Sequence, residues 1–446
     1  MLGVALAAAT LGGCVEREGG GSGDAAGLVD GVDTADCAIE ERRAWIDASM
    51  RDYYLFADTV RRVRLEDHDS ERSLLEALRV EPPDRYSHLA DEGHYDALFD
   101  EGTTFGFGWD FIRLDEDTLL FSRVSPDSPA ARAGIARGER LVAIDGEALK
   151  DFLARPPEER DRILGLPDVP TTIVLGIEAA DGARRDVSVR SESFPLVTVE
   201  ALDVVEHAGT RVGYLRFANF LGTSRAELDR AFATLAATNV GALVLDLRYN
   251  GGGRVDVAAE LAGAIGGTML ASEPFASFRH NARYAEFDTE IDFGQRFAAL
   301  DLPGVLVLTT ARTCSASELV INALEPFLDV VTIGEATCGK PFGTSPDRYC
   351  GRVLNALSVS FENAAGVGGY VDGLAPDCRV GENPRTVMGG AGDPLYATAL
   401  GFVANGTCGA LAARTAVRTG SHDGSAGLSG AGLGGSDPLL ENAVVP

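Results

Sequence analysis

The segment 195–408 constrains the fold more than any other part of the chain. It contains two continuous apolar runs, "VGALVLDLRYN" (240–250) and "GVLVLTTART" (304–313), each followed by a loop that opens a helix. Uninterrupted apolar runs of this length are typical of strands that are covered on both faces. A further strand (211–220) is followed by the helical pattern "SRAELDRAFATLAATN" (224–239). Strands that alternate with helices predict a layered α/β fold.

Two regions with different sequence patterns precede this segment. Residues 37–100 contain apolar residues at helical spacing, as in "ERSLLEALRV", and are predicted to be helical. Residues 103–194 contain short alternating strands, a small helix in "SPAARAGI" and a hairpin around Asp181-Gly182. We therefore expect a small β-domain between the helical region and the α/β domain.

The two ends of the chain differ from the rest. The short apolar run 1–14 ends in Cys14 and resembles the signal and lipidation motif of a bacterial lipoprotein, with a buried N-terminal helix as the alternative. Residues 15–36 are predicted to form a flexible tether, and the Gly/Ser-rich residues 409–446 a disordered tail. This pattern predicts an exported protein, anchored in the cell envelope through a lipid on Cys14. Val15 favours the outer membrane, facing the periplasm, because an Asp there would mark retention at the inner membrane.

The formal net charge of −28 narrows the possible partners. Nucleic acids and anionic lipid surfaces are polyanions, so we do not expect a chain this acidic to bind them. The composition, 45% hydrophobic and 24% charged, is that of an ordinary globular protein. The sequence therefore predicts a globular protein that meets the membrane only through its lipid anchor.

The cysteines suggest disulfides rather than a metal site. Six remain when Cys14 is set aside, and an even count in an exported protein favours disulfides, with free thiols as the alternative. Proximity along the chain pairs Cys338 with Cys350 and Cys378 with Cys408. The sequence has no C-x-x-C pair or His/Cys cluster, so we expect no metal, and no organic cofactor is implied.

The segment "TCSASELVINALEPF" (313–327) has two interpretations. Ser315 and Glu318 have the spacing of a capping box at a helix start. Ser315 also lies 25 residues before Lys340, which is the only lysine between it and the C-terminus. One helix and one strand separate the two residues, a connection that can bring the lysine beside the serine. A buried, neutral lysine can act as the base that a serine nucleophile needs.

An acyl-transfer site also requires hydrogen-bond donors for the developing oxyanion. The backbone N–H of Ala316 is one candidate, because N–H groups at a helix start lack partners within the helix. The loop Asn250-Gly251-Gly252-Gly253, between a buried strand and a helix, is the other. No Gly-Lys-Ser/Thr follows these glycines, so the loop is not a P-loop.

Together "DLRYNGGG", "TCSASELV" and "GEATCGK" resemble motifs of the C-terminal processing peptidases of the S41 serine protease family, and "DRYSHLADE" resembles a short motif earlier in that family. The resemblance covers roughly residues 37–405 and implies a ClpP/crotonase-like layered α/β protease domain. It implies that Ser315 is the nucleophile and Lys340 the general base. The implied oxyanion donors are the amide of Ala316 and that of Gly252 or Gly253.

Residues 103–194 resemble a PDZ domain. Gly106, Phe107, Gly108 and Trp109 stand where such a domain has its carboxylate-binding loop. Glycines there let backbone N–H groups converge on the C-terminal carboxylate of a peptide, which adds to the sheet as a strand. A β-domain that only packs internally is the alternative.

The chain departs from the family at one position. Many members have a glutamine four residues after the lysine, which orients it, and here that position is Thr344. Thr344 or Ser345 is a candidate substitute. Asp246 and Arg248 are expected to be structural and to order the glycine loop.

The sequence therefore predicts a serine endopeptidase that cleaves exported polypeptides recognised through a C-terminal or unstructured end. One alternative is a catalytically inactive, PDZ-bearing binding protein on a protease scaffold. A second is a crotonase-like acyl-CoA enzyme, against which the export signal and the few basic residues count. The helices in 37–100 could also support a homodimer.

Overall fold

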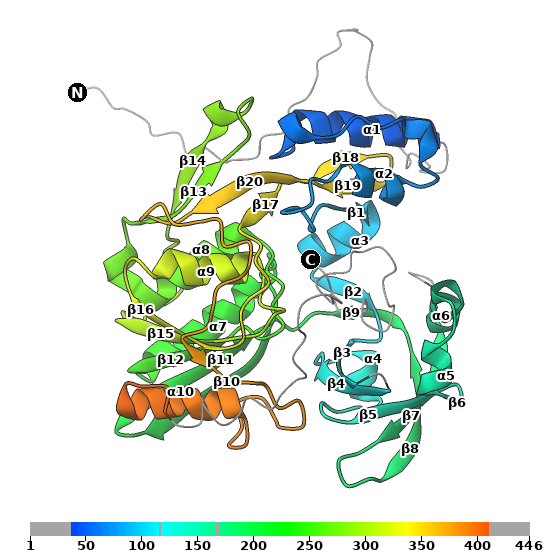
Figure 1. The fold of residues 1–446 in the computed structure, drawn as a ribbon. Helices are drawn as coiled ribbons and strands as arrows, with labels where there is room; N and C mark the ends of the chain where they lie inside the picture. Colours follow the sequence, from blue (N-terminus) through cyan, green and yellow to red (C-terminus); the bar gives the residue numbers. More distant parts are fainter. Residues whose placement is uncertain (1–36, 116, 166–168, 410–446) are drawn as a thin grey trace, which may run out of the picture. The chain divides into compact units, whose positions relative to one another are not determined.

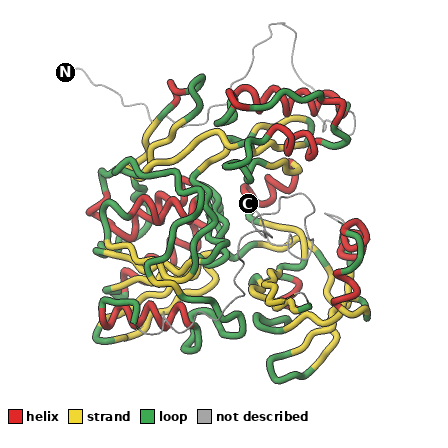
Figure 2. Tube along the Cα trace, viewed as in Figure 1, coloured by secondary structure: helices red, strands yellow, loops and turns green. Residues whose placement is uncertain are grey.

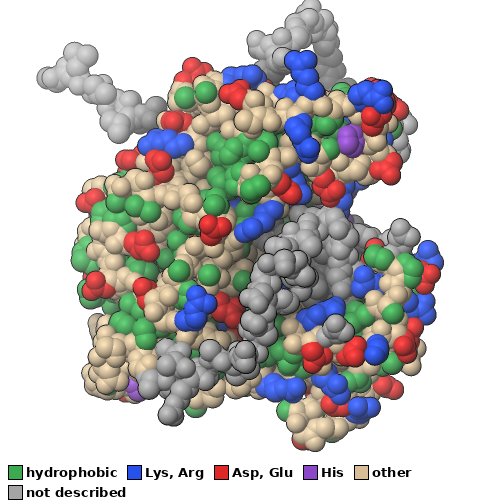
Figure 3. Space-filling model, in the orientation of Figure 1, with side chains coloured by type: hydrophobic (Ala, Val, Ile, Leu, Met, Phe, Trp, Pro, Cys, Tyr) green, Lys and Arg blue, Asp and Glu red, His purple; other side chains and the backbone are tan. Residues whose placement is uncertain are grey.

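The computed structural model describes residues 37–115, 117–165 and 169–409. The predicted signal with Cys14, the tether and the tail from residue 410 onward lie outside the described residues. None of the described helices is both long and apolar enough to cross a bilayer. Acidic and basic side chains are interspersed on the face shown in Figure 3.

A six-stranded sheet forms the centre of the α/β domain (Figure 1). Its strand order is β10-β11-β12-β15-β16-β21, parallel from β11 onward, and β10 pairs antiparallel with β11. The alternation of strands and helices predicted from the sequence is confirmed. The strands are β10 (Val199–His207), β11 (Thr210–Phe217), β12 (Ala242–Asp246), β15 (Gly304–Thr309), β16 (Asp329–Gly334) and β21 (Cys378–Arg379).

Helices cover both faces of this sheet, which is why its strands are apolar on both sides. One buried cluster joins the sheet to three helices, and a second joins its other face to a single helix. The first three are α7 (Ser224–Ala237), α8 (Val255–Gly266) and α9 (Ala316–Leu324), and the fourth is α10 (Pro394–Asn405).

The parallel strands position the chemistry-bearing loops. β12, β15 and β16 are adjacent and parallel, so their carboxyl ends lie at the same edge of the sheet. The glycine loop follows β12, the Ser315 segment follows β15, and the Lys340 loop follows β16. The sheet topology therefore brings together three segments that are far apart in the sequence.

A buried ion-pair cluster stabilises the start of the glycine loop. The Arg248 guanidinium lies 2.5 Å from Asp246 and 2.7 Å from Asp393, and all three side chains are buried. Burial would raise the pKa of Asp246, but the charge and hydrogen bonds of Arg248 hold it below its usual value. This arrangement agrees with the structural role expected for Asp246 and Arg248.

The β-domain has its own sheet, in the order β3-β4-β5-β7-β8, and strand and loop predominate in it (Figure 2). Among the described strands β3 pairs only with β4, so it lies at an edge. The predicted hairpin is confirmed as β7 and β8. The elements are β2 (Thr103–Gly106), β3 (Trp109–Asp115), β4 (Thr118–Val124), α4 (Pro129–Arg132), β5 (Arg140–Ile144), β6 (Glu147–Ala148), α5 (Leu149–Leu153), α6 (Pro157–Leu164), β7 (Thr172–Glu178), β8 (Arg184–Arg190) and β9 (Glu192–Pro195), which pairs with β2.

The N-terminal region is only partly helical. It contains α1 (Ile39–Asp52), α2 (Glu71–Leu78) and α3 (Glu92–Asp96), followed by a π-helical turn (Ala97–Glu101). The prediction fails at β1 (His88–Asp91), which pairs antiparallel with β19 (Arg352–Asn355). β19 also pairs with β18 (Asp347–Tyr349). The residues next to β1 in the sequence give no indication of a strand, because β1 is only four residues long and its partner lies far along the chain.

A four-stranded sheet in the order β14-β13-β20-β17 completes the α/β domain. β17 begins two residues after Lys340, so this sheet lies directly next to the loop that contains Lys340. The strands are β13 (Pro274–Arg279), β14 (Thr289–Asp292), β17 (Phe342–Thr344) and β20 (Leu357–Glu362). The remaining short helical turns are Ala57–Thr59, Leu65–Asp67, Gly267–Leu270 and Ala285–Phe287.

Two disulfides test the predicted cysteine pairing. Cys378–Cys408 is present, as predicted. The predicted pairing of Cys338 with Cys350 is wrong, because Cys338 is bonded to Cys314. Cys314 and Cys338 follow the neighbouring parallel strands β15 and β16, so the sheet brings their Cα atoms within 5.1 Å. Proximity in sequence could not indicate that contact.

Candidate active site

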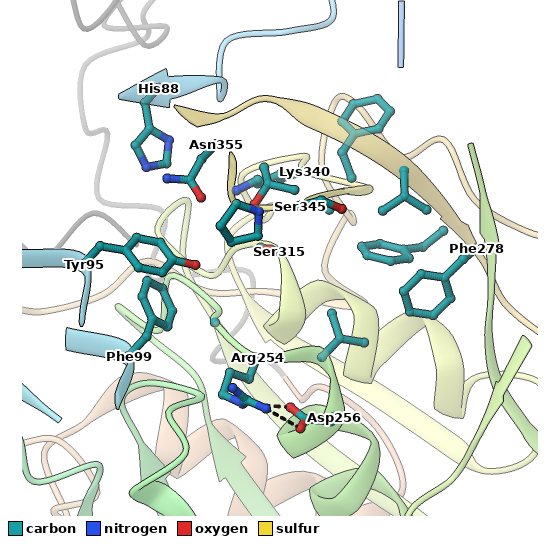
Figure 4. Close-up of a pocket in the computed structure, with 18 of the residues that line it drawn as sticks. His88, Tyr95, Phe99, Arg254, Asp256, Phe278, Ser315, Lys340, Ser345 and Asn355 are labelled. Atoms are coloured by element: carbon teal, nitrogen blue, oxygen red, sulfur yellow. Dashed lines mark hydrogen bonds and ion pairs between the residues drawn. The ribbon is translucent and has the colours of Figure 1, made fainter. Parts of the chain in front are cut away.

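A pocket of about 540 Å³ contains both predicted catalytic residues (Figure 4). Ser315 and Lys340 line it, and an apolar part of its wall comes from Phe278 and Phe361 on β13 and β20. The opposite part of the wall is provided by the N-terminal region. A pocket with a nucleophile, a base and apolar walls suits a peptide side chain and the bond beside it.

Ser315 occupies a strained position at the start of α9. Its backbone has φ 55° and ψ −117°, in the half of φ space that non-glycine residues rarely adopt. Such a conformation costs on the order of 1–3 kcal/mol and persists only where neighbouring structure holds it. Here the backbone N–H of Ser315 donates to the Glu318 carboxylate at 2.9 Å.

Glu318 connects the segment after β15, which contains Ser315 (the nucleophile segment), to the loop after β16, which contains Lys340 (the lysine loop). Its buried carboxylate accepts hydrogen bonds from the N–H groups of Ser315 (2.9 Å), Gly339 (2.7 Å) and Lys340 (2.8 Å), and from the Thr337 hydroxyl (2.5 Å). Burial raises the pKa of Glu318, although each of these donors opposes the rise. The capping-box glutamate predicted from the sequence is therefore also the link between the two halves of the candidate dyad.

The surroundings of Lys340 favour its neutral form. Burial lowers the pKa of Lys340, and the nearby carboxylates of Asp84 and Glu318 only partly oppose that shift. The Lys340 Nζ lies 5.5 Å from the centre of the Tyr86 ring. An amine with a lowered pKa is the group that can accept a proton from a serine hydroxyl.

The glycine loop packs directly against the nucleophile. Gly252 and Gly253 have φ angles of 110° and 128°, and a Cβ on Gly252 would lie 2.7 Å from the Cβ of Ser315. The N–H of Gly252 donates to the Asn250 side chain at 2.9 Å. Gly253 lines the pocket. The N–H groups of Gly253 and Ala316 are therefore better candidates for oxyanion donors than the N–H of Gly252.

Thr344 and Ser345, the two candidate lysine-orienting residues, also line the pocket. Ser345 accepts a hydrogen bond from the Ser358 hydroxyl at 3.0 Å. Within the described residues, neither candidate makes a hydrogen bond to Lys340. Their proposed role stays a prediction.

The structure also brings to the pocket residues that the sequence did not single out. His88 and Asn355 are paired across β1 and β19, and both side chains lie at the pocket (Figure 4). Tyr95 and Phe99 line the same side. His280 lines the pocket as well, and its Nδ1 lies 3.1 Å from Asp288. In the sequence, His88 stands out only through the resemblance of its motif to the family, and no local pattern marks Asn355.

The predicted carboxylate-binding loop is split between core and surface. The rings of Phe107 and Trp109 stack 4.6 Å apart and are buried in the core of the β-domain. Gly106 and Gly108 line a small hollow beside β3. The backbone of this loop, rather than the two aromatic side chains, is therefore the part that could meet a peptide.

One cluster within the described residues has the composition of a metal site. Ligand atoms of Cys314, Glu318 and Cys338 lie within 4.8 Å of one another. The two sulfurs are bonded to each other, so they are not available as thiolate ligands in this state.

Comparisons with known proteins show which family of proteins the chain resembles. Three family models match the chain: peptidase family S41 (residues 211–367), the PDZ domain (120–164) and the peptidase S41 N-terminal domain (41–88). The S41 match includes both Ser315 and Lys340.

The similar proteins with names, and one similar solved structure, are described as peptidases or proteases. A chloroplastic C-terminal processing peptidase of Tetradesmus obliquus is 26% identical over 76% of this chain and 74% of its own length. A carboxy-terminal processing protease of Bacillus subtilis is 26% identical over 58% of this chain, and the match spans only 52% of that relative. A crystal structure described as an S41 protease from Bacteroides fragilis has a TM-score of 0.68 at 26% identity, covering 81% of this chain and 97% of that one.

The role of the Glu318 carboxylate can be tested by Glu318→Gln. An amide has one acceptor oxygen, so part of the four-donor set loses its partner. We expect the free energy of unfolding to fall by about 2–4 kcal/mol and kcat to fall by about tenfold or more. Urea denaturation and peptide hydrolysis measure the two effects. Glu325→Gln makes the same change at the exposed end of α9 and should alter neither quantity appreciably. Equal effects of the two substitutions would contradict the role assigned to Glu318.

Proposed function

Because this chain belongs to peptidase family S41, we propose that it is a serine endopeptidase with Ser315 as nucleophile and Lys340 as general base. The observation that carries the proposal is that one pocket contains both residues, with burial lowering the pKa of the lysine. The substrate is a polypeptide, as the peptidase family and the PDZ domain imply.

The reaction begins with proton transfer from the Ser315 hydroxyl to the neutral Lys340 amine. The Ser315 oxygen attacks the scissile carbonyl carbon, and the resulting oxyanion accepts hydrogen bonds from the N–H groups of Ala316 and Gly253. The carbon–nitrogen bond then breaks, and the Lys340 ammonium gives its proton to the leaving amine. Lys340, neutral again, takes a proton from a water that attacks the acyl-enzyme. The bond between the acyl carbon and the Ser315 oxygen then breaks, the Lys340 ammonium returns its proton to that oxygen, and the second product leaves with a new carboxyl group.

Substrate recognition involves the PDZ domain. The edge strand β3 offers a place where a peptide can add as a strand, with its C-terminal carboxylate at the Gly106–Gly108 loop. Arg312, three residues before the nucleophile, donates to the backbone carbonyl of Phe111 on β3 at 2.8 Å. The edge to which a peptide would add is therefore in direct contact with the nucleophile segment.

The cellular setting is part of the proposal. The apolar run that ends in Cys14 supports export and lipidation, and disulfides within the fold are typical of proteins outside the cytosol. We place the peptidase on the periplasmic side of the outer membrane, attached through Cys14.

The Ser–Lys dyad predicts the behaviour of single variants. Ser315→Ala and Lys340→Ala should each lower kcat/KM for an unfolded protein substrate by a factor on the order of a thousand or more, because each removes a group that the acylation step requires. Lys150→Ala, which removes an exposed lysine of the PDZ domain, should leave the rate unchanged. If Lys340→Ala cuts like the parent, the dyad is wrong.

The dyad also predicts a pH dependence. Lys340 acts only when neutral, so kcat/KM should rise with pH and level off above the pKa of its amine. Because burial lowers that pKa, the midpoint should lie below the ordinary pKa of a lysine amine. A pH–rate profile measures it, and a rate that does not change with pH would contradict a lysine base.

Recognition of a C-terminus can be tested with one peptide in two forms. Amidation of the C-terminal carboxylate removes the charged acceptor for the backbone N–H groups of the Gly106–Gly108 loop. We expect KM to rise by about tenfold to a hundredfold, with kcat within about twofold, because the cleavage site is unchanged. Equal KM values for the two forms would show that the carboxylate is not recognised.

A further inference from the structure

We propose that Asn355 and His88 position the amine of Lys340, the task performed by a glutamine in many S41 peptidases. This inference rests on the proposed Ser–Lys mechanism. Position 344, where that glutamine would stand, is Thr344, which makes no hydrogen bond to Lys340 among the described residues. Another part of the pocket must therefore provide the orienting group.

The amide nitrogen of Asn355 has no hydrogen-bond partner among the described residues. The residue is 3% exposed, and its Nδ2 makes no hydrogen bond in the described structure. Leaving a buried amide unsatisfied costs about 1–3 kcal/mol, so such groups call for an explanation. Among the buried side chains of the described residues with an unpaired polar atom, Asn355 is the one that lines the pocket of Ser315 and Lys340.

His88 is held in one protonation state beside Asn355. Its Nδ1 lies 3.0 Å from the Tyr86 carbonyl, which can only accept, so Nδ1 carries the hydrogen and Nε2 has the free lone pair. Burial, with a smaller contribution from the charge of Lys340, lowers the pKa of His88 to about 4. A neutral His88 therefore presents an acceptor, not a positive charge, to the lysine pocket.

A neutral lysine amine needs such partners. It has one lone pair and two N–H bonds, and the lone pair faces Ser315 only if the N–H bonds are directed elsewhere. In Figure 4 the Asn355 amide nitrogen lies on the side of His88 and its oxygen on the side of Lys340. The Asn355 oxygen accepts an N–H of Lys340 in the catalytic arrangement, while its Nδ2 donates to Nε2 of His88. A chain of hydrogen bonds then extends from the Tyr86 carbonyl to the lysine.

The experiment compares two buried asparagines. Asn355→Ala should lower kcat by about tenfold to a hundredfold with KM within about twofold, and should lower the melting temperature less than Asn363→Ala does, because Nδ2 of Asn355 makes no hydrogen bond in the described structure. Asn363→Ala removes an amide that donates to the Asn322 carbonyl at 2.8 Å. It should lower the melting temperature but keep the parental pH profile. Asn355→Asp should move the rise in kcat to higher pH, because a carboxylate beside Lys340 favours the charged amine.

Rescue provides the most specific readout. Adding Thr344→Gln to Asn355→Ala restores an orienting amide from the other side of the lysine, and should recover at least part of the lost kcat. The proposal is overturned if Asn355→Ala keeps the parental kcat and pH profile while Lys340→Ala is inactive. If Lys340→Ala is active, the dyad itself has failed.

The Cys314–Cys338 disulfide independently supports a second proposal. It joins the residue before Ser315 to the residue two before Lys340, and both cysteines are only partly buried. We infer that this bond is a thiol–disulfide switch on activity. A dithiol reductant would break the sulfur–sulfur bond, leaving two cysteine thiols on the protein and becoming a disulfide itself. The strained Ser315 would then have no covalent link to the Lys340 loop, and the hydrogen bonds of Glu318 would remain as the direct connection.

The switch is tested by reduction. Dithiothreitol should lower the kcat of the parent by about tenfold as mass spectrometry of alkylated protein shows Cys314 reduced, and reoxidation should restore it. A Cys314→Ala/Cys338→Ala variant should have the lower kcat before dithiothreitol is added, and its kcat should not change when dithiothreitol is added. A Cys378→Ala/Cys408→Ala variant, which lacks the Cys378–Cys408 disulfide and keeps Cys314–Cys338, should respond like the parent. Unchanged kcat in parent protein whose Cys314 is fully reduced would overturn the proposal, whether or not either variant folds.

Discussion

The buried carboxylate of Glu318 is the interaction on which the rest of the site depends. Removing a carboxylate from water is costly unless donors replace the lost solvent. Here four donors converge on it, one from the nucleophile segment and three from the lysine loop. The same hydrogen bonds that satisfy the charge fix the position of Ser315 relative to Lys340. The parallel strands β15 and β16 bring the two segments together, and Glu318 with the Cys314–Cys338 disulfide holds them there.

Around this centre the candidate active site combines parts of three regions. The α/β domain contributes Ser315, Lys340 and the backbone N–H groups proposed as oxyanion donors. The N-terminal region contributes His88 on β1. The strand paired with β1 is β19, which contributes Asn355, and the two side chains form a polar side of the pocket. The PDZ domain contacts the nucleophile segment through Arg312 and the edge strand β3. The proposed steps of substrate recognition, lysine orientation and acyl transfer would therefore be physically connected, because each region contacts a loop that carries Ser315 or Lys340.

Much of the α/β domain and the candidate dyad could be predicted from the sequence. Long apolar runs mark strands that are buried on both faces, and the spacing of Ser315 and Lys340 matched one helix and one strand. The errors share a cause. β1 was included in a helical region, and Cys338 was paired with Cys350, because those inferences used only neighbours along the chain. His88 and Asn355 were missed for the same reason, since their pairing joins strands from opposite ends of the described chain.

By itself the sequence determined the order of strands and helices, the resemblance to peptidase family S41 and the identity of the two candidate catalytic residues. These features depend on local periodicity and on short motifs, which are properties of neighbouring residues. Only the tertiary structure decided which cysteine bonds to Cys314, which donors satisfy Glu318 and which polar groups face Lys340. Contacts of that kind depend on strand pairing and on the burial of charge, which are set when distant segments meet in the folded protein.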